Sequence, residues 1–303
     1  MKKLILCTLG FVLTCSFVAC RDSYKEKQRI SRAEQLRLAR EDSAALKIAT
    51  TPTMDCLPLF IGVADSLFQK AGVDVRLRQT NAHLDIDTLL SGGHVEGAVT
   101  ELVRAEQLQR RGTPLRYVSS TNLYWQLMAN RMSRVNRIEQ LADKMIAITR
   151  YSATDLLATM AIDSGKPKND VYRIQINDVK IRLKMLLNNE MDAELLPEPQ
   201  ATTARLARHV VLMDSRDKNY RFGVIAFREK SLAEKKRQQQ LRIFTEVYNS
   251  ICKSIDRHGV NHYARVIHQY MGADSKTIRA LPKLRYTPIT APRSRDVARA
   301  KRY

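Results

Sequence analysis

One cysteine in this chain stands in a context that predicts covalent attachment of lipid. Lys2 and Lys3 precede an apolar run that ends at Ala19, directly before Cys20. The run is too short for a comfortable membrane span, and its charged start and small final residue are typical of a secretory signal. Because lipoprotein signal peptidases cleave between a small residue and a cysteine, we expect the Cys20 thiol to carry acyl chains such as palmitate. An uncleaved anchor helix is the alternative.

The other cysteines and the histidines form no metal-binding pattern. Of the five cysteines, Cys56 and Cys252 remain once the signal and Cys20 are set aside. Since there is no CxxC pair and no Cys/His cluster, we expect no zinc or iron–sulfur site and no cofactor. Two buried free thiols are favoured over a disulfide. The histidines lack the HExxH motif and are expected at the surface: His83, His94, His209, His258, His262 and His268.

A short polar turn, Tyr151-Ser152-Ala153-Thr154-Asp155, could bind a polar solute. Ser and Thr before a helix offer hydroxyl groups and free backbone N–H groups, which suit a carboxylate, phosphate or sulfonate. The same residue types also serve as plain helix N-caps. The turn alone leaves both roles open.

Two further side chains suit a heterocyclic ligand. Trp125 is the single tryptophan, and its flat ring could stack on a heterocycle or pack between two lobes. Glu198 precedes Pro199 and a helical pattern. Its carboxylate could accept a hydrogen bond from an amino group of a ligand or complement the helix dipole.

The elements that must position these residues alternate between strand and helix. This alternation, with glycines between the elements, predicts βαβ units on mostly parallel sheets. A chain of 303 residues is longer than one compact core usually accommodates, so two lobes are expected. After about residue 222 the pattern turns helical, with one apolar face from Leu241 to Ile255. Strands are predicted at 46–50, 73–77, 95–99, 115–119, 144–149, 171–176, 193–196 and 210–213, and helices at 57–71, 84–90, 101–111, 155–164, 179–188 and 200–207.

The order of these parts resembles a known family. The segments 67–75, 138–144 and 189–193, the last followed by Glu198-Pro199, resemble motifs of type II periplasmic solute-binding proteins of ABC transporters, in the thiamine-precursor, nitrate and alkanesulfonate branch. Asn189 stands where that family usually has glycine. The resemblance implies an α/β, two-lobed type II fold, each lobe a mostly parallel sheet flanked by helices, with C-terminal helices.

With that fold, the chain divides into four parts. They are a signal peptide at 1–19, a lipid-anchored tether at 20–45, one lobe from 46–124 and 222–303, and a second lobe from 125–221.

Ligands of open α/β sheets bind at the carboxyl ends of the strands. Two lobes whose strand carboxyl ends face each other therefore form a ligand-binding cleft. The residues that follow the strands are therefore ligand-binding candidates. Several of them are carboxylates, so an amine-bearing or neutral heterocycle is slightly favoured over an oxyanion. The candidates are Thr53, Asp55, Asn81, Thr100, Glu101, Trp125, Tyr151, Ser152, Thr154, Asn177 and Glu198.

The net charge of +20 invites a nucleic-acid hypothesis, but the basic residues are dispersed and no nucleic-acid motif accompanies them. The sequence instead predicts a non-enzymatic, extracytoplasmic lipoprotein that binds a small solute and delivers it to an ABC permease and ATPase. Two alternatives stay open. One is an enzyme on the same fold, as in pyrimidine or menaquinone-precursor synthesis, and the other is a sensor or scaffold lipoprotein.

Overall fold

The structure is a computed structural model that describes residues 34–303. The predicted signal peptide and Cys20 lie outside the described residues. The chain divides into two compact units, Met1–Ala45 and Leu46–Tyr303. In the first unit residues 34–44 are helical and mostly exposed, and Arg37 donates to Glu34 and Glu41, pairs that stabilise a solvated helix.

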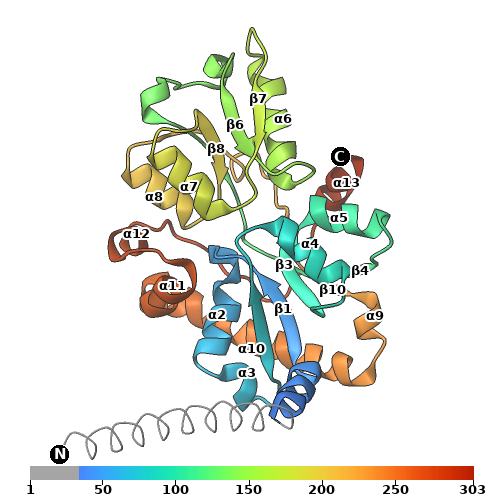
Figure 1. The fold of residues 1–303 in the computed structure, drawn as a ribbon. Coiled ribbons are helices and arrows are strands. Elements are labelled where there is room, and N and C mark those ends of the chain that lie inside the picture. The colour runs from blue at the N-terminus through green and yellow to red at the C-terminus, as the bar shows by residue number, and fades with distance from the viewer. Residues whose placement is uncertain (1–33) are drawn as a thin grey trace, which may run out of the picture. The chain divides into compact units, whose positions relative to one another are not determined.

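Two five-stranded sheets form the second unit (Figure 1). The first sheet has the order β2-β1-β3-β10-β4 and the second the order β7-β6-β8-β5-β9. This confirms the expected two-lobed α/β fold. The strands are β1 (Leu46–Thr50), β2 (Val75–Gln79), β3 (Gly97–Glu101), β4 (Leu115–Ser120), β5 (Gln126–Ala129), β6 (Met145–Ile148), β7 (Tyr172–Gln175), β8 (Ala193–Leu196), β9 (Val210–Asp214) and β10 (Gly223–Arg228).

Each sheet holds one antiparallel strand that the sequence did not predict. β10 pairs antiparallel with β3 and β4, and β5 pairs antiparallel with β8 and β9. Both strands follow directly after the chain passes from one sheet to the other, at residues 121–125 and 215–222, which we call the two crossings. Neither strand is flanked by the strand–helix alternation on which the sequence analysis relied, so both were missed.

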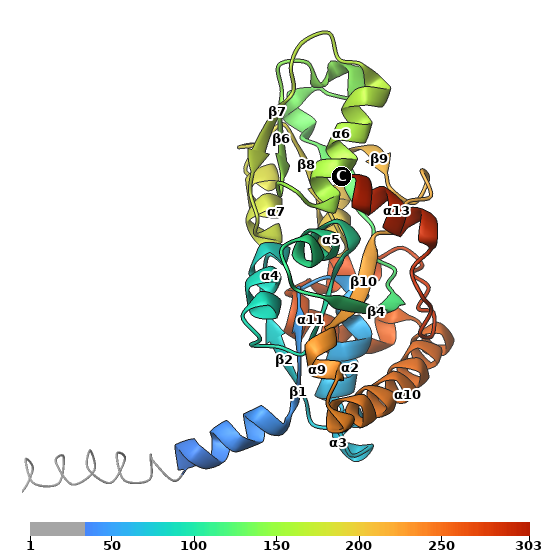
Figure 2. The same cartoon turned by 90° about the vertical axis from the view of Figure 1, so that its right-hand side faces the viewer.

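Helices cover the faces of the sheets (Figure 2). The expected helix 57–71 is broken in two, because Ser66 adopts the left-handed conformation with φ 55°. The helices are α2 (Leu57–Ala64), α3 (Leu67–Lys70), α4 (His83–Ser91), α5 (Leu102–Arg110), α6 (Ala153–Gly165), α7 (Val179–Leu187), α8 (Gln200–Leu206), α9 (Glu229–Leu232), α10 (Lys235–His258), α11 (Ala264–Met271), α12 (Ser275–Arg279) and α13 (Ser294–Arg302).

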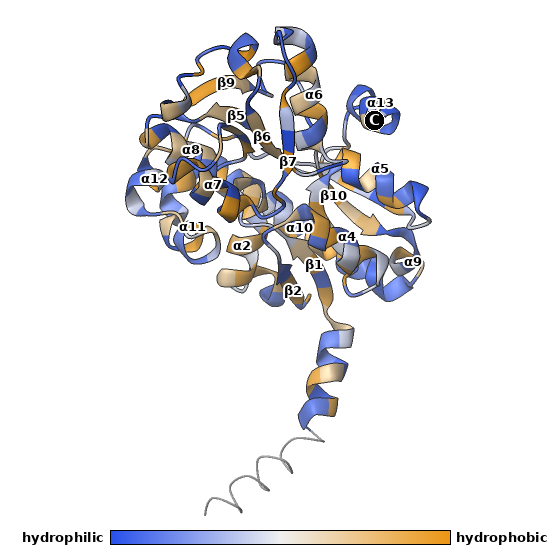
Figure 3. Cartoon of the chain, turned by 45° about the horizontal axis from the view of Figure 1, so that its top comes forward, coloured by the Kyte–Doolittle hydropathy of each residue, from blue (hydrophilic) through white to orange (hydrophobic). Residues whose placement is uncertain are grey.

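The C-terminal helices α10 and α11 pack against α2, beside the first sheet. Leu241, Phe244, Tyr248 and Ile251 of α10 are buried, which confirms the apolar face expected there. In Figure 3 several central strands are coloured as apolar, whereas the helices carry both apolar and polar residues. Among the helices of residues 34–303, none combines the length and the apolar character that a membrane span requires.

The expectation that every histidine lies at the surface is wrong. His209 is buried and its Nδ1 accepts from the backbone N–H of Arg131 at 3.2 Å, and the Nε2 atom of His83 is also buried. Cys56 and Cys252 are both free and buried, as expected. Isolated histidines carry no sequence pattern that distinguishes a buried ring from an exposed one.

Candidate functional site

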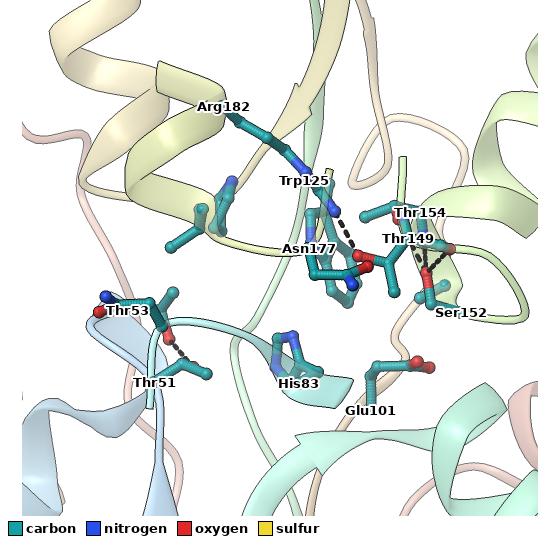
Figure 4. Close-up of a pocket in the computed structure, with 14 residues that line it drawn as sticks. Thr51, Thr53, His83, Glu101, Trp125, Thr149, Ser152, Thr154, Asn177 and Arg182 are labelled. Carbon is teal, nitrogen blue, oxygen red and sulfur yellow. Dashed lines mark hydrogen bonds between the residues drawn. The ribbon is translucent and has the colours of Figure 1, made fainter. Parts of the chain in front are cut away.

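A cavity lies where the carboxyl ends of strands from both sheets face each other (Figure 4). Its wall combines hydroxyl and amide groups with one indole ring, one imidazole, one guanidinium and one carboxyl group. The lining residues are Thr51, Thr53, Asn81, His83, Glu101, Trp125, Thr149, Ser152, Ala153, Thr154, Asn177, Val179, Arg182 and Pro197.

Backbone hydrogen bonds join the two sides of this cavity. The Met54 N–H donates to the Glu198 carbonyl at 2.9 Å, and the Val179 N–H donates to the Asn81 carbonyl at 3.1 Å. The cavity is only about 20 Å³ in volume, room for little more than a water molecule. The arrangement is therefore closed, and a larger solute enters only if the two sheets move apart.

The Glu101 carboxyl group bridges the two sides. Glu101 ends β3 and is the N-cap of α5, where it accepts from the N–H groups of Val103 (2.7 Å) and Arg104 (3.1 Å). The N–H of Ala153, the first residue of α6, acts on the same carboxyl group from across the cavity and lowers its pKa. Burial raises the pKa of Glu101 to about 8, while the Arg104 guanidinium and the N–H groups oppose that rise. A carboxyl group of the chain itself thus lies beside the N-terminus of α6.

The polar turn before α6 is held by its own hydroxyl groups. The Ser152 hydroxyl donates to the Thr149 carbonyl at 2.6 Å and accepts from the Thr154 N–H at 3.1 Å. The Thr154 hydroxyl accepts from the Thr149 N–H at 2.9 Å. Ser152 is therefore an N-cap in this closed state, and both hydroxyl groups have partners within the turn.

Arg182 of α7 reaches the cavity from a buried position. Its guanidinium donates to the carbonyl groups of Ile176 (2.6 Å) and Leu195 (3.1 Å) and to the Thr149 hydroxyl. Burial lowers the pKa of Arg182 to about 10, which still leaves it cationic at neutral pH. Glu194 of β8 is fully buried, and burial raises its pKa to about 9, so it holds a proton at neutral pH.

His83 contributes a neutral imidazole to the cavity. Its buried Nε2 has no hydrogen-bond partner among residues 34–303. Burial and the charges of Arg104 and Arg182 lower its pKa to about 3. The neutral ring can donate or accept according to its tautomer, and the amides of Asn81 and Asn177 lie in the same wall.

Most of the residues predicted from the sequence line this cavity, and four do not. Asp55 is buried and accepts from the hydroxyl groups of Thr53 (2.6 Å) and Thr121 (3.2 Å). Thr100 is buried within β3, and Tyr151 is 56% exposed. The predicted residues on the wall are Thr53, Asn81, Glu101, Trp125, Ser152, Thr154 and Asn177.

Glu198, the fourth residue away from the wall, joins the first crossing to α8. Its carboxylate accepts from the Tyr124 hydroxyl (2.7 Å), the Thr202 N–H (2.9 Å) and the Arg205 guanidinium (2.6 Å). The Glu198 side chain is almost completely buried. The structure thus places this carboxylate in a network that fixes the crossing.

The candidates did not include seven of the lining residues: Thr51, His83, Thr149, Ala153, Val179, Arg182 and Pro197. Thr149 directly follows β6 but fell inside the predicted strand 144–149, whereas Pro197 directly follows β8, whose bounds were predicted correctly, and was still left out. Arg182 lies one turn inside a helix, where an arginine carries no special signal. In the described part of the chain, no group of three or more His, Cys, Asp or Glu side chains could hold a metal ion.

A family model described as NMT1/THI5 like matches residues 53–250 of this chain. No curated protein matches by sequence. The match to the family model covers every strand of both sheets except β1, and it includes every lining residue of the cavity except Thr51.

Solved structures share the fold. The ligand-binding component of an ABC-type import system from Staphylococcus aureus, solved with zinc bound, has a TM-score of 0.70 at 14% identity, over 85% of this chain and 91% of that one. The alkanesulfonate-binding protein SsuA from Xanthomonas axonopodis pv. citri, bound to MOPS, has a TM-score of 0.67 at 17% identity, over 85% and 90%. The nitrate-binding protein NrtA from Synechocystis PCC 6803 has a TM-score of 0.65 at 12% identity, over 77% and 68%.

Proposed function

This chain belongs to the NMT1/THI5-like family, and from that premise we propose that it is the solute-binding protein of an ABC importer. The observation that carries the proposal is the closed cavity between the carboxyl ends of two sheets, joined by the backbone hydrogen bonds from Met54 to Glu198 and from Val179 to Asn81. Such a cavity can release and recapture a solute by movement at the crossings. The likeness to binding components of importers supports the same role.

We propose that residues 46–124 and 222–303 form one lobe and residues 125–221 the other. The composition of the two sheets supports this division, because β10 returns to the first sheet after the second crossing. The contacts of α10 and α11 with α2 support it for the C-terminal helices.

The solute proposed is a neutral or amine-bearing heterocycle and not an oxyanion. An oxyanion would lie beside the Glu101 carboxyl group, and the Thr154 N–H at the start of α6 is already bonded to the Ser152 hydroxyl. The buried Nε2 atom of His83, which has no hydrogen-bond partner among residues 34–303, belongs to a neutral ring. The Trp125 indole and the amides of Asn81 and Asn177 supply a flat surface and hydrogen-bond partners for a heterocycle.

Fluorescence tests this assignment directly, because Trp125 is the only tryptophan and lines the cavity. Mass spectrometry of solute released from the purified protein should identify a nitrogen heterocycle, and titration of that solute into the stripped protein should change the Trp125 emission saturably. MOPS and nitrate should give no saturable change. A saturable response to either anion, with no heterocycle released, would contradict the proposed solute class.

A matched pair of variants tests the location of the solute. Asn177→Ala, in the cavity wall, should weaken binding of the released solute about tenfold, the effect of one or two lost hydrogen bonds. Asn136→Ala, at an exposed position outside the wall, should leave the affinity unchanged. Equal affinities of the two variants for the released solute would show that the solute does not bind in this cavity.

No catalytic role is proposed. The one carboxyl group in the wall, Glu101, already accepts from the N–H groups of Val103 and Arg104. It is therefore poorly placed to act as a general base in this closed state. Conversion of the released solute to a product by the purified protein would favour the enzymatic alternative.

The proposal places the protein outside the cytoplasmic membrane, anchored through lipid on Cys20. This residue lies outside the described residues, so the support comes from the sequence Ala19-Cys20 after the apolar run. Metabolic labelling with a palmitate analogue should mark the wild-type protein and not Cys20→Ser. Equal labelling of both would contradict lipid attachment at this cysteine.

A further inference from the structure

A second cavity lies at the crossings. It is bounded by residues 120–124 of the first crossing, residues 216–221 of the second and residues 283–287 near the C-terminus, and its volume is about 470 Å³. We call it the crossing pocket. None of its lining residues lines the cavity between the sheets. Its volume falls in the range of small-molecule sites, so it can hold a ligand in the closed arrangement.

All charged side chains that line the crossing pocket are cationic. They are Arg216, Arg221, Lys283 and Arg285. The Arg216 guanidinium is neutralised by Asp214 at 2.7 Å. Within residues 34–303 the other three make no ion pair with a carboxylate.

Three uncompensated positive charges around one hollow raise the local electrostatic potential and attract anions. A bound anion with two or more negative charges would relieve their mutual repulsion. Arginine also provides paired N–H donors that match a phosphate or a carboxylate. The charge of the pocket therefore selects for multivalent anions.

The walls of the pocket are held in place by contacts between the three segments. The Asn122 side-chain amide donates to the Arg285 carbonyl at 3.0 Å, which ties residues 283–287 to the first crossing. The Arg293 guanidinium donates to the side chain and carbonyl of Asn219 at 2.7 and 2.8 Å, which ties the second crossing to the segment before α13. A site with fixed walls requires little ordering when a ligand binds.

Apolar groups complete the pocket and indicate an organic ligand. Leu123, Leu284 and the rings of Tyr124 and Tyr220 line it together with the cations. The Arg216 guanidinium lies 3.8 Å from the centre of the Tyr124 ring, a cation–π contact that orients both groups. These surfaces would cover the body of a small molecule whose charged groups face Arg221, Lys283 and Arg285.

We propose that the crossing pocket binds a small organic anion that carries several negative charges, as phosphate or as carboxylate groups. The proposal concerns a site separate from the cavity between the sheets and does not depend on the solute bound there. Pyrophosphate and citrate serve as probes of the two kinds of charged group, with acetate at matched ionic strength as the monovalent reference.

Calorimetry on the full chain should show saturable binding of pyrophosphate, of citrate or of both, and none of acetate. The double variant Lys283→Gln/Arg285→Gln should weaken binding at least tenfold, since two charge-assisted contacts are lost. Lys236→Gln/Arg242→Gln removes the same two residue types from exposed positions on α10 and should change the affinity less than about twofold. Because Arg221 is exposed, Arg221→Gln provides a second variant if the double variant does not fold.

Hydrogen exchange locates the bound probe. Pyrophosphate or citrate should slow exchange in peptides that cover residues 121–125 and 215–222. Slower exchange at residues 149–154 instead would place the anion in the cavity between the sheets and overturn the proposal. Equal loss of affinity in both double variants would also overturn the proposal, because it would indicate attraction by the overall charge of the protein. The proposal would likewise fail if neither pyrophosphate nor citrate bound.

Discussion

Glu101 serves both sides of the cavity with one carboxyl group. On the side of its own sheet it caps α5, and across the cavity the Ala153 N–H at the start of α6 lowers its pKa. The same side chain thus caps a helix on one side of the cavity and lies against the helix that begins on the other side. The polar residues around it, Thr51 and Thr53 of the first sheet and Ser152 of the second, are already paired within their own turns.

The stability of the protein should depend on pH through Glu101. Burial raises its pKa from the ordinary 4.5 to about 8, so the folded chain binds this proton more tightly than the unfolded chain. The contribution is fully present below pH 4.5 and is lost as the pH rises towards about 8, with a slope of at most about 1.4 kcal/mol per pH unit. Glu101→Gln should flatten this part of the curve in urea unfolding.

Glu106→Gln is the matched control for that experiment, since it removes another buried carboxyl group of α5. It should keep the wild-type slope between pH 4.5 and about 8. A Glu101→Gln protein with an unchanged slope would show that Glu101 does not titrate in this range.

Glu198 should matter for stability more than for recognition of the solute. Glu198→Ala leaves the Tyr124 hydroxyl, the Thr202 N–H and the Arg205 guanidinium without their acceptor. We expect the free energy of unfolding to fall by about 2–4 kcal/mol in the alanine variant. Glu198→Gln keeps an acceptor oxygen and should lose less. Equal losses in urea unfolding would indicate that the hydrogen bonds contribute little.

At the scale of elements, α6 connects the site to the second sheet. Its N-terminus carries both the Ser152 cap and the link to Glu101, while its buried face packs Leu156, Leu157 and Ala161. Movement of this helix would therefore alter the cavity directly.

Loss of the Ser152 cap should destabilise α6. Ser152→Ala removes the acceptor of the Thr154 N–H and should lower the free energy of unfolding by about 0.5–2 kcal/mol. Ser164→Ala, an exposed change near the other end of the same helix, should stay within about 0.5 kcal/mol of the wild type. Similar values for the two variants would contradict a capping role for Ser152.

At the scale of the molecule, closure depends on hydrogen bonds between elements of the two sheets. The Arg104 guanidinium of α5 donates to the Arg150 carbonyl at 3.1 Å, and the Gln200 amide of α8 donates to the Pro52 carbonyl at 3.0 Å. Each bond is modest in water, so a few such contacts allow a closed state that still opens.

A disulfide across the cavity between the two sheets should hold the molecule in its closed state. The Val179 N–H and the Asn81 carbonyl are 3.1 Å apart, so their main chains are adjacent. When Asn81→Cys/Val179→Cys is oxidised, small-angle scattering should give a smaller radius of gyration than in its reduced form, and the Trp125 response to the released solute should disappear. Reduction should restore both. Identical scattering and an unchanged response in the two states would argue against opening of this cavity.

Much of the fold could be predicted from the sequence because its signals are local. The spacing from Leu241 to Ile255 predicts the buried face of α10, since helix periodicity relates neighbouring residues. The strand-end rule likewise identified Asn81, Glu101 and Asn177 as residues of one cavity. The rule assumes that the carboxyl ends of the strands in the two sheets face each other. That assumption came from the resemblance to a known family.

Only the tertiary structure decided the remaining features, because they depend on residues far apart in the chain. Nothing near Gly223–Arg228 indicates that this strand inserts antiparallel between β3 and β4. Arg182 is buried through its contacts with Ile176, Leu195 and Thr149, which follow or belong to three different strands. The Arg104 guanidinium finds its acceptor, the Arg150 carbonyl, 46 residues away along the chain. The sequence by itself determined most of the helices and strands and the strand ends at which ligands are expected to bind. Packing determined which side chains meet at those strand ends, because contacts between distant segments produce no periodic pattern in the sequence.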